Sequence, residues 1–173
     1  MKITSLFLSL LVICTAAIAG PKAMKLNPPT AAPETEGTDQ EGKAVKFADV
    51  YKANKFVVVY FYPKADTPGC TKQGCSLRDA HGDLTSQGVK VIGVSHDTVK
   101  EEKDFSDKFK FPFTLIADSE GKVIKAFNVV QKPNGMASRE CFLIKEGKIV
   151  WHDPAASTDK QADDLKAVLA ELK

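Results

Sequence analysis

Residues 56–79 read FVVVYFYPKADTPGCTKQGCSLRD, and within them a strand pattern gives way to a helix pattern. Residues 56–62 are a continuous run of β-branched and aromatic side chains, which is typical of a central strand buried on both faces. Pro63 ends this run. Residues 70–87 are predicted to be helical, and the glycine that follows them is the stop signal. The apolar residues at helical spacing are Leu77, Ala80 and Leu84.

Strand-like and helix-like stretches alternate further along the chain. Residues 89–95 (VKVIGVS) predict the next buried strand, and Thr98-x-x-Glu101 is a capping box that opens a helix. The charged residues 100–104 of that helix are expected to form a solvated face. Residues 114–117 predict a short strand, whereas the pattern of the segment that follows, KVIKAFN, fits either a strand or a short helix.

The last third of the chain predicts a hairpin and a closing helix. A Glu-Gly turn at 146–147 separates strands at 140–145 and 148–152. Thr158-x-x-Gln161 is predicted to cap the final helix. The full order, with early parallel crossovers and a late antiparallel hairpin, predicts an α/β fold with a central mixed sheet and helices on both faces. A thioredoxin-like domain has this layout, and so do other α/β sandwiches.

Composition indicates one globular domain without a nucleic-acid-binding face. The chain has 173 residues, 43% of them apolar and 27% charged, which is enough for a normal core. The net charge is +2, from 24 Lys and Arg against 22 Asp and Glu, and no basic cluster stands out. Nucleic-acid binding would require a concentrated basic face.

The N-terminus has the pattern of a signal peptide. Lys2 precedes the apolar run ITSLFLSLLVICTAAIA, which ends in the small-x-small sequence that signal peptidase recognises. We therefore expect residues 1–19 to be a cleaved signal peptide, residues 20–34 (GPKAMKLNPPTAAPE) an extended arm, and residues 35–173 the domain. The expected location is the bacterial periplasm, with no membrane attachment in the mature form.

Two other interpretations of the N-terminus stay open. Cys14 is a candidate lipoprotein site, but Ile13 stands before it, where a small residue is expected. The apolar run is also near the lower length limit for a membrane anchor, about 17 residues. Its compactness and small-residue end favour cleavage.

Three cysteines remain after cleavage, Cys70, Cys75 and Cys141, which suggests one pair and one single thiol. Cys141 lies in an apolar strand pattern, so a buried inert thiol is expected. Cys70 falls at the start of the predicted helix. Unpaired amide groups and the helix dipole stabilise an anion there, and the thiolate is the nucleophilic form of cysteine. Thr67 lies three residues earlier with a hydroxyl that is able to hydrogen-bond the thiolate.

Cys75 is too far from Cys70 to pair with it inside an intact helix. Five residues of helix separate their Cα atoms by about 8.7 Å, whereas a disulfide spans at most about 7 Å. If the two pair, the first helical turn must unwind. A structural disulfide and a metal site are the alternatives. Zinc needs three or four ligands. The remaining candidate ligands have no convincing spacing; they are His81, His96, His152 and Cys141. We therefore expect neither a metal nor a cofactor.

The sequence Pro63-x-x-x-Thr67-x-x-Cys70 resembles the peroxiredoxin signature PxxxTxxC. The segment TPGCTKQGCSLRD is similar to that of the peroxiredoxin Q or bacterioferritin comigratory protein subgroup. The flanking sequences YFYPKADTPGC, GVSHDTVKEEKDFSDKFKFPFTLIAD and SRECFLIKEGKIVW extend the resemblance over most of the chain from about residue 40 onward.

The resemblance implies a role for each matching residue. Cys70 corresponds to the peroxidatic cysteine, and Cys75 to a resolving cysteine in the same helix. Thr67 corresponds to the threonine that contacts thiolate and peroxide. Pro63 corresponds to the proline that shields the site, and Arg139 to the arginine that stabilises the thiolate and polarises the peroxide.

This chain departs from the family at three places. Gln73 stands where some members have Glu, so its role is less defined. The opening segment 31–43 (AAPETEGTDQEGK) lacks the usual aromatic, which suggests an altered first strand. Glu140 and Cys141 replace residues that are more often small and hydroxylated.

The implied activity is an exported thiol-dependent peroxidase that reduces hydrogen peroxide and organic hydroperoxides through a Cys70 sulfenic acid and a Cys70–Cys75 disulfide. A thioredoxin-like dithiol recycles the pair, and the protein is a monomer or weak homodimer. One alternative is an exported thiol–disulfide oxidoreductase acting on proteins, although such enzymes usually carry CxxC. Another is a non-enzymatic domain with a structural disulfide.

Overall fold

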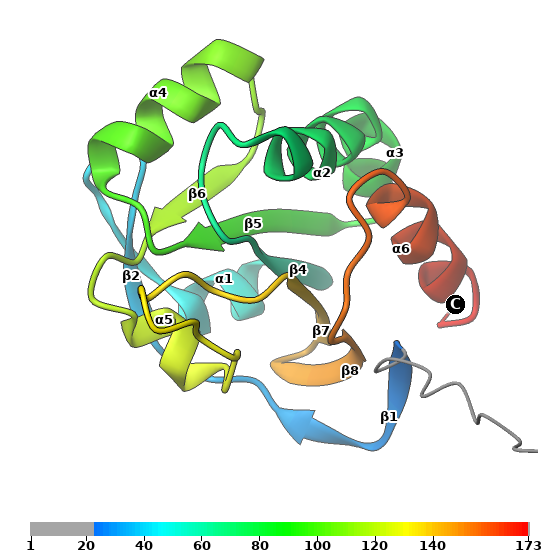
Figure 1. Ribbon diagram of the computed structural model, residues 1–173. Coiled ribbons are helices and arrows are strands. Elements are labelled where there is room, and N and C mark those ends of the chain that lie inside the picture. Colours follow the sequence, from blue (N-terminus) through cyan, green and yellow to red (C-terminus); the bar gives the residue numbers. More distant parts are fainter. Residues whose placement is uncertain (1–22, 173) are drawn as a thin grey trace, which may run out of the picture.

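A computed structural model describes residues 23–172 of the chain. The central strand of its sheet is β4, Phe56–Phe61. It pairs in parallel with β5 (Val89–Ser95) and antiparallel with β7 (Glu140–Lys145). The sheet has eight strands in the order β1-β8-β7-β4-β5-β6-β2-β3 (Figure 1). The other strands are β1 Met24–Ala31, β2 Glu36–Asp39, β3 Ala44–Lys46, β6 Thr114–Ala117 and β8 Lys148–Asp153. The predicted mixed sheet is confirmed.

Helices cover both faces of this sheet (Figure 1). Alternate residues of β4 enter two different cores. Phe56, Val58 and Tyr60 pack with one set of helices, namely α2 Pro68–Asp79, α3 His81–Ser86, α4 Val99–Phe109 and α6 Gln161–Ala170. Val57, Val59 and Phe61 pack with the other set, namely α1 Phe47–Ala53 and α5 Lys122–Ala126. All six β4 side chains are buried, as the apolar run predicts.

Two predicted helix boundaries differ from the structure. The helix expected over 70–87 is two helices, because Ala80 departs from helical geometry with a ψ of 1° and serves as C-cap of α2 and N-cap of α3. The prediction that Thr158 caps the final helix is wrong. α6 starts after Lys160, whose amide donates to Ser157 Oγ at 2.7 Å, so the serine organises the turn instead.

Two other local predictions are resolved by the structure. The Thr98–Glu101 capping box is confirmed: the Glu101 amide donates to Thr98 Oγ1 at 3.3 Å, and the Thr98 amide donates to Glu101 Oε2 at 2.9 Å. The ambiguous segment after β6 contains α5, a short helix.

The N-terminal arm contributes a strand. Within the expected arm 20–34, residues 24–31 form β1, which pairs antiparallel with β8. The opening segment 31–43 contains β2, which pairs with β6 near the opposite edge of the sheet. The predicted signal peptide, residues 1–19, lies outside the described residues. None of the helices within 23–172 is long and apolar enough to cross a membrane.

Gly74 of α2 provides a test of how tightly this helix is packed. A Cβ at this position would lie 2.6 Å from Phe111 Cζ, and the Phe111 ring is held between Phe105 and Phe113 at centroid distances of 4.8 and 5.2 Å. We expect Gly74→Ala to lower the free energy of unfolding in urea by about 1–3 kcal/mol because of overpacking. Gly82→Ala is the matched control. It has open space around its Cβ, and we expect it to stabilise the protein by about 0.5–1 kcal/mol. Equal effects of the two substitutions would contradict the packing described for α2.

Candidate active site

Cys70 lies in the first turn of α2, as predicted. β4 ends at Phe61, residues 63–67 form a loop, and α2 begins at Pro68, where the missing amide hydrogen of proline costs no helical hydrogen bond. The cysteine is only 2% exposed and packs in the core beneath α2. A nucleophile at this position is close to the unpaired amide groups of the helix start and is shielded from bulk water.

Arg139, in the segment before β7, contacts Cys70 at the start of α2. Its Nη2 donates to Cys70 Sγ at 3.4 Å. The strand register explains the contact, because β7 pairs with β4 so that Glu140 faces Phe61. Arg139, one residue before β7, is therefore beside the loop that leads to α2. A guanidinium at this distance stabilises a thiolate through a charge-assisted hydrogen bond.

Thr67 and Pro63 lie in the loop before α2, and both are half-buried. The Thr67 hydroxyl donates to the Lys64 carbonyl at 2.9 Å. The Thr67 carbonyl accepts from the Thr71 amide at 2.8 Å, which is the first hydrogen bond of α2. In this structure Thr67 thus shapes the loop and the helix start, while its hydroxyl is directed to the backbone.

Cys75 is half-buried and lies in the same helix as Cys70. Both are free thiols, and the intact helix holds them apart, as its geometry requires. Cys141 is also free, and it is fully buried in β7. Burial raises the pKa of its thiol well above the ordinary value, so the expected buried thiol is confirmed.

Gln73 extends the contact between Arg139 and the helix. Arg139 Nη1 donates to Gln73 Oε1. Gln73 Nε2 in turn donates to Gln161 Oε1 at 2.9 Å, and both glutamines are fully buried. Gln161 was predicted only as part of a helix cap, because nothing in the local pattern links it to a residue 88 positions away.

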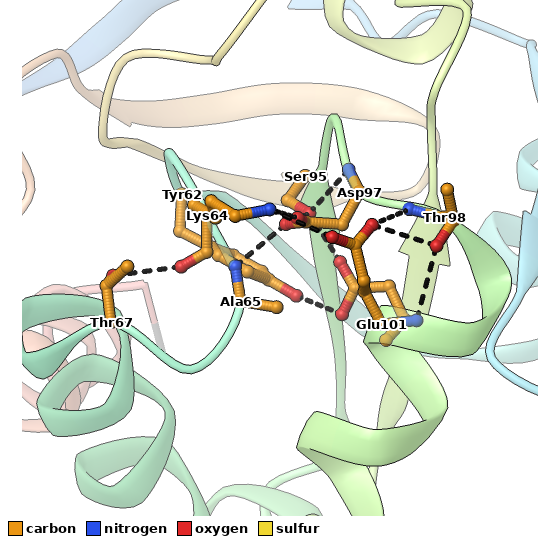
Figure 2. A network of polar contacts seen from close by, with 9 residues as sticks. Tyr62, Lys64, Ala65, Thr67, Ser95, Asp97, Thr98 and Glu101 are labelled. Atoms are coloured by element: carbon orange, nitrogen blue, oxygen red, sulfur yellow. Dashed lines mark hydrogen bonds and ion pairs between the residues drawn. The ribbon is translucent and has the colours of Figure 1, made fainter.

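A polar network anchors the loop between β4 and α2 (Figure 2). Asp97, 3% exposed, accepts from the Ala65 amide at 2.7 Å and from Lys64 Nζ at 2.8 Å. Ser95 Oγ donates to the same carboxylate at 2.5 Å. The loop is thereby attached to the end of β5. The sequence pattern identified neither Ser95 nor Asp97; the loop partners of Asp97, Lys64 and Ala65, lie 33 and 32 positions away.

Residues 28–152, most of the chain, match the family model described as AhpC/TSA. The chain belongs to the AhpC/TSA family. It is 36% identical over 134 residues to "Peroxiredoxin bcp1" of Schizosaccharomyces pombe, covering 74% of this chain and 68% of that protein. The predicted membership of the peroxiredoxin Q and bacterioferritin comigratory protein group is confirmed, and with it the enzyme class of a thiol-dependent peroxidase.

Solved structures of this group share the fold. Peroxidoxin BcpB of Mycobacterium tuberculosis superposes with a TM-score of 0.77 at 28% identity, covering 87% of this chain and 99% of that one. The bacterioferritin comigratory protein of Xanthomonas campestris gives a TM-score of 0.72 at 28% identity, covering 80% and 91%. The predicted thioredoxin-like fold is therefore confirmed.

Glu102 is a buried carboxyl group beside the family's active-site loop. It was expected on a solvated helix face, but it is fully buried, because this position of α4 faces the sheet. Its Oε2 accepts from the Tyr62 hydroxyl, and its Oε1 lies 2.5 Å from Ser95 Oγ, whose own hydrogen is directed to Asp97, so a protonated Glu102 donates to this oxygen. Burial raises the pKa of this carboxyl from 4.5 to about 8, so Glu102 is largely protonated at neutral pH.

No group of three or more His, Cys, Asp or Glu side chains within residues 23–172 is arranged to hold a metal ion.

The raised pKa of Glu102 predicts a pH-dependent stability. The folded protein keeps the Glu102 proton up to about pH 8, whereas the unfolded chain releases it near the ordinary pKa of 4.5. Between these values the unfolded state binds fewer protons, so the stability due to this group falls as pH rises, by about 1.4 kcal/mol per pH unit. Relative to wild type, Glu102→Gln should become progressively more stable in urea unfolding between pH 5 and pH 8.

Glu120→Gln is the control, because this carboxylate is exposed on the surface turn before α5. It should leave the pH dependence unchanged. The same pH dependence in wild type and Glu102→Gln would contradict a protonated buried Glu102.

Proposed function

We propose that the protein is an exported peroxiredoxin in which Cys70 attacks hydroperoxides and Cys75 resolves the product. The observation that carries this assignment is the contact between Arg139 Nη2 and Cys70 Sγ at the start of α2. A nearly buried thiolate beside a guanidinium and a helix start is nucleophilic and charge-compensated.

The first step breaks the O–O bond of the peroxide. The Cys70 thiolate attacks the peroxide oxygen that carries hydrogen, and the electron pair of the O–O bond moves to the other oxygen, which takes a proton from solvent and leaves as water or an alcohol. Cys70 becomes a sulfenic acid. Arg139 lies where negative charge moves from sulfur to oxygen, and its guanidinium stabilises that charge.

The substrate class includes hydrogen peroxide and organic hydroperoxides. The structure of the Xanthomonas campestris relative is reported with an alkyl peroxide reduction activity. In the present chain the sulfur packs against the apolar core beneath α2, an environment compatible with an organic substituent on the peroxide.

The second step requires α2 to open. The Cys75 thiol attacks the sulfenic sulfur of Cys70, water leaves, and an intramolecular disulfide forms. Because the folded helix holds the two residues apart, the first turns of α2 must unwind before this attack. A thioredoxin-like dithiol then reduces the disulfide by thiol exchange.

The cysteines provide the test of this cycle. In a single-turnover reaction with hydrogen peroxide, Cys70→Ser should consume no peroxide, because the nucleophile is missing. Cys75→Ser should consume one peroxide per molecule and stop at the sulfenic acid. Cys141→Ala is the control and should turn over like wild type when dithiol is present, because Cys141 is buried in β7.

Peroxide turnover by Cys70→Ser at the wild-type rate would refute the assignment. Reduction of protein disulfides without any reaction with peroxide would instead support a thiol–disulfide oxidoreductase.

Export is the second part of the proposal. The signal-peptide pattern of residues 1–19 supports it, and the reductant then acts outside the cytosol, in the periplasm. We expect the mature protein to begin at Gly20, to be free of the membrane and to be a monomer or weak homodimer. Intact-mass spectrometry of the protein from cell fractions should find a periplasmic species starting at Gly20. A cytosolic species that retains Met1 would exclude export.

A further inference from the structure

A chain of side-chain hydrogen bonds connects α6 with the reactive sulfur. Gln161 is the first residue of α6 and is fully buried. Its Oε1 accepts from Gln73 Nε2 at 2.9 Å, Gln73 Oε1 accepts from Arg139 Nη1, and Arg139 Nη2 donates to Cys70 Sγ at 3.4 Å. Three hydrogen bonds therefore link α6 to the sulfur.

The direction of these bonds depends on how the Gln73 amide is turned. A primary amide has an oxygen that accepts and a nitrogen that donates, and the two ends have nearly the same shape. If the Gln73 amide were turned over, its NH₂ group would face the Arg139 guanidinium, which has donors only. The bond from Gln73 Nε2 to Gln161 Oε1 favours the orientation that gives Arg139 an acceptor.

The docking of α6 on α2 keeps Gln161 in this place. The Ala162 amide donates to Ser76 Oγ at 3.2 Å, so the first turn of α6 is attached to α2 next to Gln73. The Gln161 Nε2 group is buried and has no hydrogen-bond partner within residues 23–172. Its Oε1, by contrast, is the acceptor for the fully buried Gln73 Nε2 group, so the hydrogen bonding of Gln161 is directed to Gln73.

We infer that Gln161 is a positioning residue for the reaction of Cys70 with peroxide. It fixes the orientation of the Gln73 amide, and Gln73 in turn keeps Arg139 against the sulfur. The inference rests on the proposed function, and Gln161 itself touches neither the sulfur nor the peroxide.

Substitution of Gln161 by methionine, which has a similar length and no strong acceptor, tests this role. The quantity to measure is the second-order rate constant for loss of the Cys70 thiol on mixing with hydrogen peroxide, quenched by alkylation. We expect Gln161→Met to react about fivefold more slowly than wild type, the effect of one hydrogen bond of ordinary strength. Lys160→Met, an exposed position one residue earlier, is the matched control and should react at the wild-type rate.

A rescue experiment separates positioning from a general structural effect. In Gln73→Glu the side chain presents an oxygen to Arg139 in either orientation, so Gln161 is no longer needed to select it. The double variant Gln73→Glu/Gln161→Met should therefore match Gln73→Glu. A loss of rate in the double variant as large as that in Gln161→Met alone would overturn the inference.

The remaining outcomes are also decisive. If Gln161→Met does not give a folded circular dichroism spectrum, Gln161→Ala removes the same acceptor with a smaller side chain. A folded Gln161 variant that reacts at the wild-type rate would overturn the inference while leaving the proposed function intact. Failure of the wild-type protein to react with peroxide would instead overturn the proposed function.

Discussion

The contact between Arg139 and Cys70 is the interaction on which the site depends. A cysteine that is 2% exposed is a poor place for a negative charge unless a positive group lies beside it. The antiparallel register of β4 and β7 meets this requirement, because the residue before Glu140 must fall next to the loop that follows Phe61. A register shift of one residue would turn every side chain of β7 to the opposite face and remove the guanidinium from the site.

Two sets of contacts hold the reactive segment, and they attach to different elements. The loop before α2 is anchored to β5 through Asp97, which binds Ala65 and Lys64. The helix itself is anchored to α6, through Gln73 and Ser76. Unwinding of the first turns of α2 would disturb the Gln73 contact and leave the contacts of Asp97 with the loop intact. The proposed cycle therefore needs only part of the site to rearrange between its two steps.

Local patterns in the sequence predicted much of the fold. The buried run of β4, the capping box of α4 and the position of Cys70 at a helix start are each determined by residues within a few positions of one another. The resemblance to peroxiredoxins pointed to Arg139, and the structure then explained its placement. The prediction that Thr158 caps the final helix was wrong because the hydroxyl of the neighbouring Ser157 accepts the hydrogen bond from the Lys160 amide.

The polar residues that support the site could not be predicted in this way. Asp97, Glu102 and Gln161 interact with residues that are distant in sequence. Glu102 in particular stands in a run of charged residues, and only the packing of α4 against the sheet shows that it faces inward. Periodicity identifies buried apolar positions, but a buried polar group becomes recognisable only when its partner is known.

The pairing of β1 with β8 brings the first and last strands of residues 23–172 together. β1 lies at the edge of the sheet, and its partner is Lys148–Asp153. Within residues 23–172, β8 is the only neighbour of β1 in the sheet, so the other side of β1 is a free edge. Its side chains are mostly polar or exposed, and it contains Pro28 and Pro29, which lack the amide hydrogen that edge-to-edge association uses. The edge of the sheet at β1 is therefore poorly suited to pair with a strand of another molecule.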